Sequence, residues 1–310
     1  MRDKAPILVT GAHRTGTTWV GKMLTASGQA AYISEPLNVL HRPGVLRVPT
    51  SHWYTYICND NEQAYLQPIQ EMLGFRYHGL AEIKSLRSRK DLMRMGRDGW
   101  TFTLGKLRRQ RPLIKDPFAV FSIPWFIQRL GCQVVVTVRH PAAFASSLKR
   151  LDWPFDFNDL LAQPLLMRDW LEPYRSQLES SAQNNISDLL AQASLLWRII
   201  YDLVARFQQD YPQIQVVRHE DLAKNPLDGY RALYAALDLS YSEHAQQTIR
   251  ESSSSDNPKE ANRQKAFATR LDSQAVLQGW KKRLTTAEIT HIRRLTEDLA
   301  TIYYPEWSWD

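Results

Sequence analysis

The chain has 310 residues, 44% of them hydrophobic, which suffices for one large α/β core. Its 39 Lys and Arg exceed its 32 Asp and Glu, and the net charge of +7 favours an anionic ligand, but no long block of like charge indicates a nucleic-acid-binding protein. Two isolated cysteines exclude a disulfide framework or cysteine metal cage, and no apolar run reaches the roughly 18 residues of a membrane span. We therefore expect a cytoplasmic protein that neither inserts into membranes nor binds nucleic acid.

The first predicted elements are a strand, a tight loop and a helix within the segment 7–22, ILVTGAHRTGTTWVGK. Residues 7–9 are an apolar run, Gly11 and Gly16 bracket the loop, and apolar residues recur at helical spacing from Trp19. A loop of this kind directs backbone N–H groups and the positive end of a helix dipole to one point. The segment therefore predicts an anion site, above all for phosphate.

This loop differs from the nucleoside-triphosphate motif GxxxxGK[ST]. That motif requires Lys at position 17, where this chain has Thr17. The strong cation of the loop is instead Arg14, whose guanidinium can bind an anionic group, and the hydroxyls of Thr15 and Thr18 add donors. The pattern favours a phosphate-bearing donor that is held without a metal ion.

The segment RTGTTW resembles the 5′-phosphosulfate loop of the sulfotransferases that use 3′-phosphoadenosine 5′-phosphosulfate (PAPS), in particular the bacterial and carbohydrate-type branch. The family pattern is a basic residue, a small residue, then Gly-Thr-Thr-aromatic. The resemblance implies a three-layer α/β/α fold with a central parallel sheet, P-loop-like at its start, in a single domain over 1–310. It also implies that PAPS is the donor, that 3′-phosphoadenosine 5′-phosphate (PAP) is the product, and that no metal is required. The donor-binding residues would include Arg14, Thr15, Gly16, Thr17, Thr18 and Trp19.

A second strand is predicted over 30–33, and Glu35 follows it directly, before Pro36. A carboxylate just past a strand end lies on the face where α/β sheets bind ligands. Many carbohydrate and bacterial members of the resembled family carry a Glu-Pro-Leu-like segment here, and some are thought to use an acid in this region as general base. The resemblance therefore makes Glu35 a candidate base.

The segment 37–110 has poor periodicity and is rich in aromatic and basic residues. We expect helices over 62–73 and 80–93 and no strong strand. Because a long insertion between strands is where a fold places specificity, we assign the acceptor side of the site to this segment. Aromatic faces with scattered donors suit a saccharide or another small-molecule alcohol, although for any single one of these side chains we favour packing in a satellite core.

The next predicted strand, over 111–114, exits at Lys115 and Asp116, at the same edge as Arg14 and Glu35. In the resembled family the lysine at this strand end touches the transferring group, and in some branches a catalytic histidine follows it. No histidine follows here, so the base is Glu35, Asp116 or a group from the insertion, and we rank Glu35 first and Asp116 second. A structural alternative is that Lys115 and Asp116 pair to cap a helix predicted over 120–130.

The clearest strand is predicted over 132–138, a continuous β-branched run typical of a parallel sheet. It ends at Arg139, and a helix is predicted over 142–151 with Pro141 in its first turn. The segment RHPAAFASSL resembles the family's 3′-phosphate site, which has Arg at the strand end and Ser eight residues later. A guanidinium with a hydroxyl from the next helix suits a ribose 3′-phosphate, so Arg139 and Ser147 are assigned to it.

The C-terminal part predicts a helix over 186–209, a strand over 214–217 and a final helix over 286–302. The acids that follow the strand, Glu220 and Asp221, resemble family residues that look structural. In the segment 251–284 a low-complexity loop, ESSSSDNP, precedes basic residues, where family members have a basic loop that covers the donor. Three residues compete for the 3′-phosphate there, and the sequence does not choose among them: Arg263, Lys265 and Arg270.

Together the resemblances imply transfer of a sulfuryl group from PAPS to an acceptor hydroxyl, or to an amine, with alignment and charge stabilisation supplying most of the rate. Arg14 would stabilise the leaving oxygen, Lys115 would assist at the sulfuryl oxygens and Glu35 would take the acceptor proton. The acceptor could be a saccharide, a lipid-linked sugar, a polyketide-like alcohol or a phenol, and the oligomeric state is open. The alternatives are a P-loop small-molecule kinase, which would require ATP and a metal ion, and a non-catalytic nucleotide-binding module.

Overall fold

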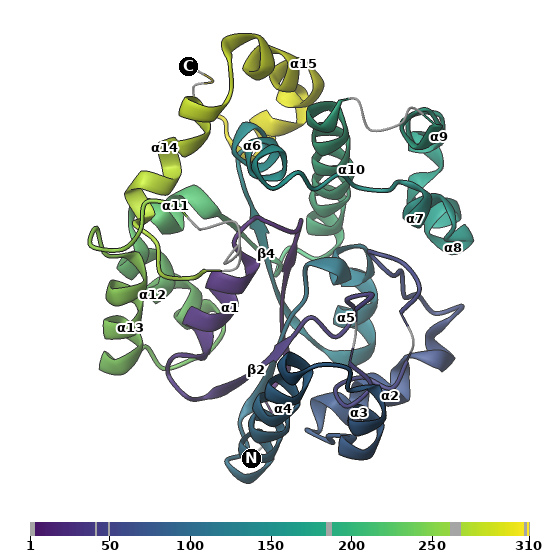
Figure 1. The fold of residues 1–310 in the computed structure, drawn as a ribbon, viewed down its shortest axis with the longest axis vertical. Helices are drawn as coiled ribbons and strands as arrows, with labels where there is room; N and C mark the ends of the chain where they lie inside the picture. The colour runs from purple at the N-terminus through teal and green to yellow at the C-terminus, as the bar shows by residue number, and fades with distance from the viewer. Residues whose placement is uncertain are drawn as a thin grey trace.

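A computed structural model describes residues 4–40, 42–48, 50–183, 188–260, 268–306 and 309. Within these ranges one sheet of five parallel strands runs in the order β2-β3-β1-β4-β5 (Figure 1). The strands are β1 (Ile7–Gly11), β2 (Ala30–Ser34), β3 (Arg111–Lys115), β4 (Gln133–Val138) and β5 (Gln215–Arg218). Each lies within two residues of its predicted position. Because β1 is central, its end at Gly11 lies between the ends of β3 and β4.

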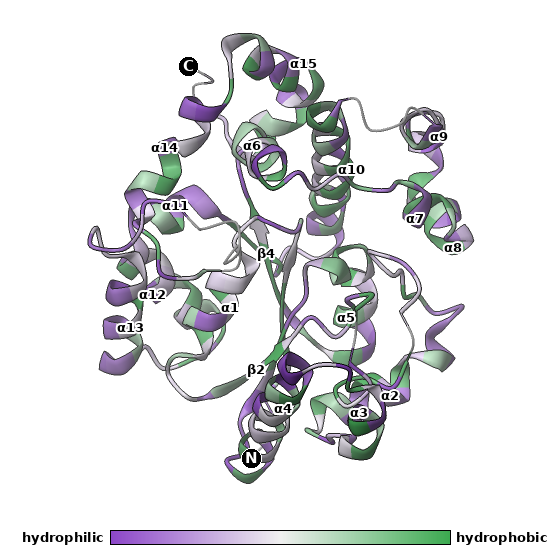
Figure 2. Ribbon diagram, viewed as in Figure 1, coloured by the Kyte–Doolittle hydropathy of each residue, from purple (hydrophilic) through white to green (hydrophobic). Residues whose placement is uncertain are grey.

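Helices cover both faces of the sheet and make three layers (Figure 1). Ile7 and Val9 of β1 belong to one buried core, whereas Leu8 belongs to a second core on the other face of the sheet. Successive side chains of a strand point to opposite faces, so one apolar run supplies both cores. Figure 2 shows the result, with hydrophobic residues along the sheet and on the helix sides that face it. The predicted three-layer α/β/α fold is confirmed.

The helices of the two faces are α1 (Thr17–Thr25), α12 (Pro226–Ala236) and α13 (Glu243–Ser253), and α5 (Ile123–Leu130), α6 (Pro141–Leu151), α10 (Leu189–Asp210) and α15 (Thr286–Tyr303). The remaining helices are α2 (Leu66–Leu73), α3 (Gly79–Ser85), α4 (Arg89–Leu107), α7 (Asn158–Leu161), α8 (Pro164–Leu166), α9 (Arg175–Gln183), α11 (His219–Lys224) and α14 (Ser273–Arg283). In the described ranges, every helix is too short or too polar to cross a bilayer.

Three helix boundaries differ from the prediction. The single helix predicted over 80–93 is wrong, because Leu86 is extended and the Ser88 hydroxyl, accepting the backbone N–H of Asp91 at 3.2 Å, begins a new helix. The helix predicted from position 120 is a 3₁₀ turn up to Ser122 before α5 begins. The loop predicted from Glu251 also begins too early, because residues 251–253 complete α13.

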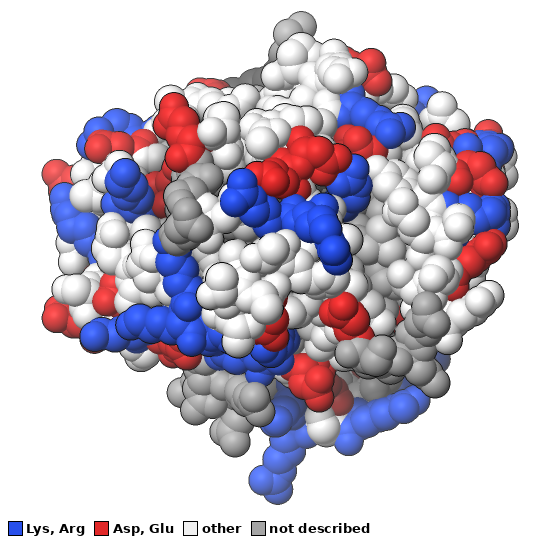
Figure 3. Space-filling model, turned by 90° about the horizontal axis from the view of Figure 1, so that it is seen from above, with Lys and Arg blue, Asp and Glu red and all other residues white. Residues whose placement is uncertain are grey.

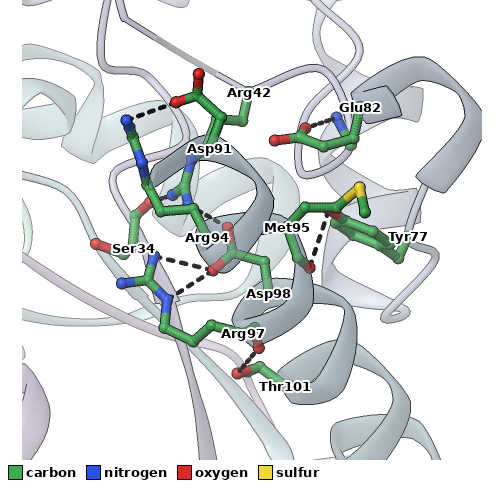
Figure 4. A network of polar contacts seen from close by, with 11 residues as sticks. Ser34, Arg42, Tyr77, Glu82, Asp91, Arg94, Met95, Arg97, Asp98 and Thr101 are labelled. Carbon is green, nitrogen blue, oxygen red and sulfur yellow. Dashed lines mark hydrogen bonds and ion pairs between the residues drawn. The ribbon is translucent and has the colours of Figure 1, made fainter. Parts of the chain in front are cut away.

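The insertion 37–110 is attached to the edge of the sheet through β2 and α4. Arg42 forms an ion pair with Asp98 of α4 and donates to the backbone carbonyl of Ser34, the last residue of β2, at 3.1 Å (Figure 4). Glu82 of α3 accepts the backbone N–H of Gly44 at 2.7 Å. These buried polar contacts fix the loop that follows Glu35, so the insertion is bound to the end of the sheet where the site residues lie.

Candidate functional site

The loop between β1 and α1 is shaped by two glycines. Gly16 begins α1 with φ 98°, and a Cβ there would lie 2.6 Å from Nδ1 of His219. Gly11 has φ 135°, and a Cβ there would lie 2.4 Å from the carbonyl oxygen of Thr137. Only glycine combines these backbone angles with such close approach. The loop therefore directs the N-terminal N–H groups of α1 past the end of β1, as an anion site requires.

Thr15 fixes the loop from inside. Its hydroxyl donates to the carbonyl oxygen of Ala12 at 2.6 Å and lies 2.8 Å from the hydroxyl of Thr137, and its side chain is fully buried. A hydroxyl already committed to the protein has little capacity left for a ligand. The structure thus places Thr15 in the wall that supports the loop, whereas Thr17 and Thr18 border open space.

A cavity of about 900 Å³ opens at the carboxyl ends of the strands, within the size range of small-molecule sites. Eight of the sequence-predicted residues line it: Arg14, Gly16, Thr17, Thr18, Trp19, Glu35, Arg139 and Ser147. Four others do not, namely Thr15, Lys115, Asp116 and Arg270. Arg263 and Lys265 lie outside the described residues.

Arginines from three parts of the chain converge on this cavity. The Arg14 Nε donates to the Ser147 hydroxyl at 3.4 Å, and Arg139 donates to the backbone carbonyl of Arg14 at 3.2 Å. Burial and the charges of Arg139 and Arg150 lower the pKa of Arg14 to about 10. The Nε of Arg139 is buried and has no hydrogen-bond partner among the described residues. A bound anion would relieve both the repulsion between the arginines and this unmet donor.

The C-terminal segment contributes a different cation from the one predicted. Arg270 is 69% exposed, pairs with Glu251 at 3.1 Å and does not itself line the cavity. Arg283, at the end of α14, lines the cavity, where it donates from Nε to the Ser146 hydroxyl at 2.9 Å and also pairs with Glu260. Among the C-terminal cations in the described ranges, Arg283 is thus better placed than Arg270 to meet an anion beside Arg139.

Glu35 also borders the cavity, but it follows the edge strand β2, whereas Arg139 follows β4, and β3 and β1 lie between these two strands. Its carboxylate forms an ion pair with Lys115 and accepts from the side-chain amide of Asn38 at 2.8 Å. Its φ of 49° is unusual for a residue other than glycine. Lys115 is only 2% exposed and lies behind Glu35 rather than on the cavity. The lysine therefore orients the carboxylate from inside the protein.

Asp116 is fully buried and supports the same turn. It accepts the backbone N–H groups of Leu37 at 2.6 Å and of Phe118 at 2.9 Å. Burial and the nearby charge of Glu35 raise the pKa of Asp116 to about 7. Such a pKa would suit a base, but the carboxyl group does not border the cavity. Asp116 therefore caps the turn after β3. The sequence had offered a capping pair of Lys115 and Asp116 as an alternative, and the structure, which describes both residues, shows the cap by Asp116 but no ion pair with Lys115.

His13, which the sequence did not single out, also lines the cavity. Its Nδ1 lies 2.7 Å from the Tyr54 hydroxyl, and that same oxygen accepts the backbone N–H of His13 at 3.3 Å. Because burial and the charge of Arg14 lower the pKa of His13 to about 4, the ring is neutral near pH 7. We assign the Tyr54 proton to Nδ1, which leaves the His13 proton on Nε2. His13 is thus a neutral hydrogen-bond donor in the loop.

Aromatic side chains form the wall beside Glu35. Trp53 and Phe118 pack with ring centroids 4.4 Å apart, and Phe155 borders the same space. The guanidinium carbon of Arg14 lies 5.6 Å from the Trp153 ring centroid. These residues surround the space between Arg14 and Glu35 with apolar surface. No group of three His, Cys, Asp or Glu in the described part of the chain is placed to hold a metal ion.

Comparison with known proteins identifies the family. The model of the sulfotransferase family matches residues 6–243, which include all five strands. Among solved structures, the sulfotransferase domain of the Synechococcus PCC 7002 olefin synthase is similar with 15% identity and a TM-score of 0.50, covering 99% of this chain and 98% of that one. Sulfotransferase STF9 from Mycobacterium avium is similar with 13% identity and a TM-score of 0.49, covering 99% and 78%. A search of curated protein sequences found no match.

The family match spans more than half of the chain, including the loop after β1 and the strand that ends at Arg139. The olefin synthase domain, at 15% identity, shows the shared fold alone. The five-stranded parallel sheet with helices on both faces agrees with both findings. The chain therefore belongs to the sulfotransferase family.

Proposed function

We propose that this chain transfers a sulfuryl group from PAPS to the hydroxyl of a small-molecule or saccharide acceptor. The observation that carries the proposal is one cavity lined both by arginines and by Glu35, which follow different strands of the sheet. Arg14, Arg139 and the start of α1 make what we assign as its cationic end, which suits a nucleotide with two anionic groups. Glu35 and the aromatic side chains line what we assign as its acceptor end, which suits a hydroxylated acceptor.

The residues at the cationic end fit the donor that the family implies. The N–H groups that follow Gly16, with the hydroxyls of Thr17 and Thr18, would bind the 5′-phosphosulfate. Arg139 and Ser147 would bind the 3′-phosphate, since the Nε of Arg139 is buried without a partner among the described residues. Arg283 borders the same end, so we assign to it the contact that the sequence left open among three other cations. PAPS, when bound, would supply an activated sulfuryl group, and the proposed reaction uses no metal ion.

The chain's own residues would move one proton and stabilise one charge. The acceptor oxygen forms a bond to sulfur while the bond from sulfur to the bridging phosphate oxygen breaks, and PAP leaves. Glu35 takes the proton of the acceptor hydroxyl, held in place by Lys115 from behind. Arg14 and the loop N–H groups stabilise the negative charge that grows on the leaving oxygen. His13 donates from Nε2 to the oxygens of the sulfuryl group, which lies between Glu35 and Arg14 during the transfer.

The acceptor end suits a molecule with both a hydroxyl and an apolar face. Trp53, Phe118 and Phe155 offer ring surfaces, and Asn38 of the insertion adds a polar group beside Glu35. Aromatic faces pack well against the C–H face of a sugar ring or against a phenol ring. This supports the assignment of acceptor binding to the insertion 37–110.

The experiment is a turnover assay with PAPS and a panel of saccharides, phenols and aliphatic alcohols, measuring PAP release. We expect PAP release that rises with at least one acceptor class. Turnover should fall at least about a hundredfold in Glu35→Gln, because general-base catalysis contributes factors of that order. Arg231→Gln, at an exposed ion pair on α12, is a control that should retain full turnover. No acceptor-dependent PAP release, with ATP consumed instead in the presence of Mg²⁺, would contradict the proposal and support the kinase alternative.

A further inference from the structure

Helix α4 presents a row of apolar side chains to the outside of the protein. Met93, Trp100 and Leu107 are 69%, 65% and 74% exposed. They are seven residues apart, nearly two helical turns, so they lie along one side of the helix over about 21 Å. The buried residues of α4 lie on the opposite side and include Phe102 and Gly105. The row is therefore the outer side of a helix whose inner side is already packed.

Basic side chains flank this apolar row. Lys90, Arg94 and Arg97 recur at spacings of four and three residues and so form a neighbouring row on α4. Nine Lys and Arg between positions 84 and 109 are exposed. Of the two acids in this segment, Asp98 is buried and Asp91 is paired with Arg94 at 2.8 Å. The exposed charge of the segment 84–109 is therefore strongly positive. By contrast, basic and acidic groups intermix over much of the molecular face that Figure 3 shows.

The helix that carries both rows is firmly held. Figure 4 shows Asp98 bound by Arg42 and Arg97, while the Tyr77 hydroxyl donates to the carbonyl oxygen of Met95 at 3.4 Å. No residue of α4, which the structure describes throughout, lines the cavity that contains Arg14 and Glu35. The outer side of α4 is thus a surface on a firmly anchored helix. Its apolar row cannot be explained as one wall of the substrate cavity.

We propose that the outer side of α4, formed by Met93, Trp100, Leu107 and the flanking basic residues, docks this protein on an anionic lipid bilayer. Trp, Leu and Met suit the boundary between headgroups and acyl chains, and Lys and Arg beside them meet anionic headgroups. A second copy of this chain is a poorer occupant, because a symmetric contact would bring two positive surfaces together. The proposal does not depend on sulfuryl transfer.

The test is co-sedimentation of the full chain with vesicles. One vesicle type is phosphatidylcholine alone, and the other contains phosphatidylglycerol as a third of its lipid. We expect the bound fraction to be at least about fivefold greater on the anionic vesicles and to fall as salt is raised, because exposed charges are screened. The double variant W100S/L107S should lose most of this binding, and so should R89E/K90E. Because acidic side chains stabilise the first turn of a helix, R89E/K90E should not weaken α4 itself.

Two matched variants control for nonspecific effects. Ile302→Ser removes an apolar side chain that is 60% exposed on α15, and R231E/R250E reverses two charges on α12 and α13. Both controls should bind anionic vesicles like the wild type, and thermal unfolding should show all variants folded. Equal binding to both vesicle types, or equal binding of the α4 variants, would overturn the proposal. A dimer that forms without lipid and is abolished by W100S/L107S would assign the row to a second copy of this chain and overturn the proposal. Binding of the α4 surface to an acidic protein, with vesicle binding that does not depend on lipid composition, would also overturn it.

Discussion

At the scale of single residues, two of the cavity-lining residues that the proposed reaction uses have strained backbone angles. Arg14 and Glu35 have φ of 69° and 49°, angles that cost a non-glycine residue of order 1 kcal/mol or more. Each is held by hydrogen bonds of its own backbone: the Arg14 carbonyl accepts from Arg139, and the Glu35 N–H donates to the Lys115 carbonyl at 2.7 Å. Strain that the surroundings maintain at a cavity supports a functional role for both residues.

The two candidate bases can be separated by mutation. Glu35→Gln should lower kcat at least about a hundredfold with little change in PAP affinity, since Glu35 borders the acceptor end only. Asp116→Asn should lower the free energy of unfolding, because Asp116 accepts two backbone N–H groups in a buried turn, while kcat falls much less. The measurement is kcat for each variant alongside PAP binding. Near-wild-type turnover in Glu35→Gln with a collapse in Asp116→Asn would reverse the assignment.

His13 should act as a donor and not as a proton acceptor. Its pKa of about 4 keeps the ring neutral above pH 5, so it should add no step to the pH dependence of kcat between pH 5 and 8. His13→Gln retains an N–H donor and should keep more activity than His13→Ala. Tyr54→Phe should also lower kcat, because it removes the group that fixes the ring. An acidic limb of kcat that disappears in His13→Gln would show that His13 itself titrates.

The site residues whose position follows from a motif at a strand end were predictable from the sequence. The residues whose place in the site depends on side-chain packing were not. Arg14 and Arg139 follow strands directly, so the sequence placed them at the sheet edge and the cavity contains both. Lys115 stands at an equivalent position, but its side chain packs inward past Gly21, where a Cβ would be 3.2 Å from it. The direction of a side chain at a strand end depends on such contacts. His13 had a detectable signal, being a titratable residue inside the loop, but its partner Tyr54 is 41 residues away.

At the scale of elements, the turn between β1 and α1 should tolerate no side chain at Gly16. Gly16→Ala should weaken PAP binding at least about tenfold and destabilise the protein by roughly 1 kcal/mol or more, because the added Cβ meets His219 at 2.6 Å at a φ of 98°. Gly28→Ala is the matched control, since Gly28 has φ 74° but nothing within 4 Å of the added Cβ. Calorimetric PAP titration and thermal unfolding measure both effects. Equal losses in the two variants would mean that backbone strain, not contact with His219, explains the requirement.

Strands were more predictable than helix boundaries. Buried parallel strands leave continuous β-branched runs such as VVV in β4, which few other structures produce. The break between α3 and α4 has no comparable signal, because residues on both sides favour helix and only the Ser88 cap separates them. The acceptor role of the insertion 37–110 and the donor-covering role of the segment 251–284 stay predictions, as does a single domain over 1–310.

At the scale of the whole molecule, several buried groups make stability depend on pH. Burial lowers the pKa of His13 to about 4 and those of His140 and His219 to about 3, from 6.5 in the unfolded chain. Below pH 6.5 the unfolded chain binds protons at these sites that the folded protein does not. The free energy of unfolding contributed by these histidines therefore decreases as the pH is lowered. Asp116 and Glu220 oppose this, because their raised pKa values let the folded protein bind protons first.

Because three histidines favour the unfolded chain at low pH and only two acids oppose them, we predict that the protein loses stability as the pH is lowered from 6.5 to 4.5. The measurement is the free energy of unfolding by urea at several pH values in that window. His219→Asn, which removes one of the three groups, should flatten the dependence. A protein that becomes more stable on acidification over this range would show that the buried acids dominate instead.

The central claim is that the cavity binds a 3′-phosphorylated nucleotide, and thermal unfolding with PAP, with ATP plus Mg²⁺ and with neither tests it most directly. A ligand at a hundredfold excess over its Kd stabilises the native state by about 2.7 kcal/mol, which raises Tm by several degrees. We expect a rise with PAP that is much reduced in Arg139→Gln and Ser147→Ala and unchanged in the control Arg231→Gln. A rise with ATP and Mg²⁺ but not with PAP, or an equal rise with PAP in all four proteins, would contradict the account.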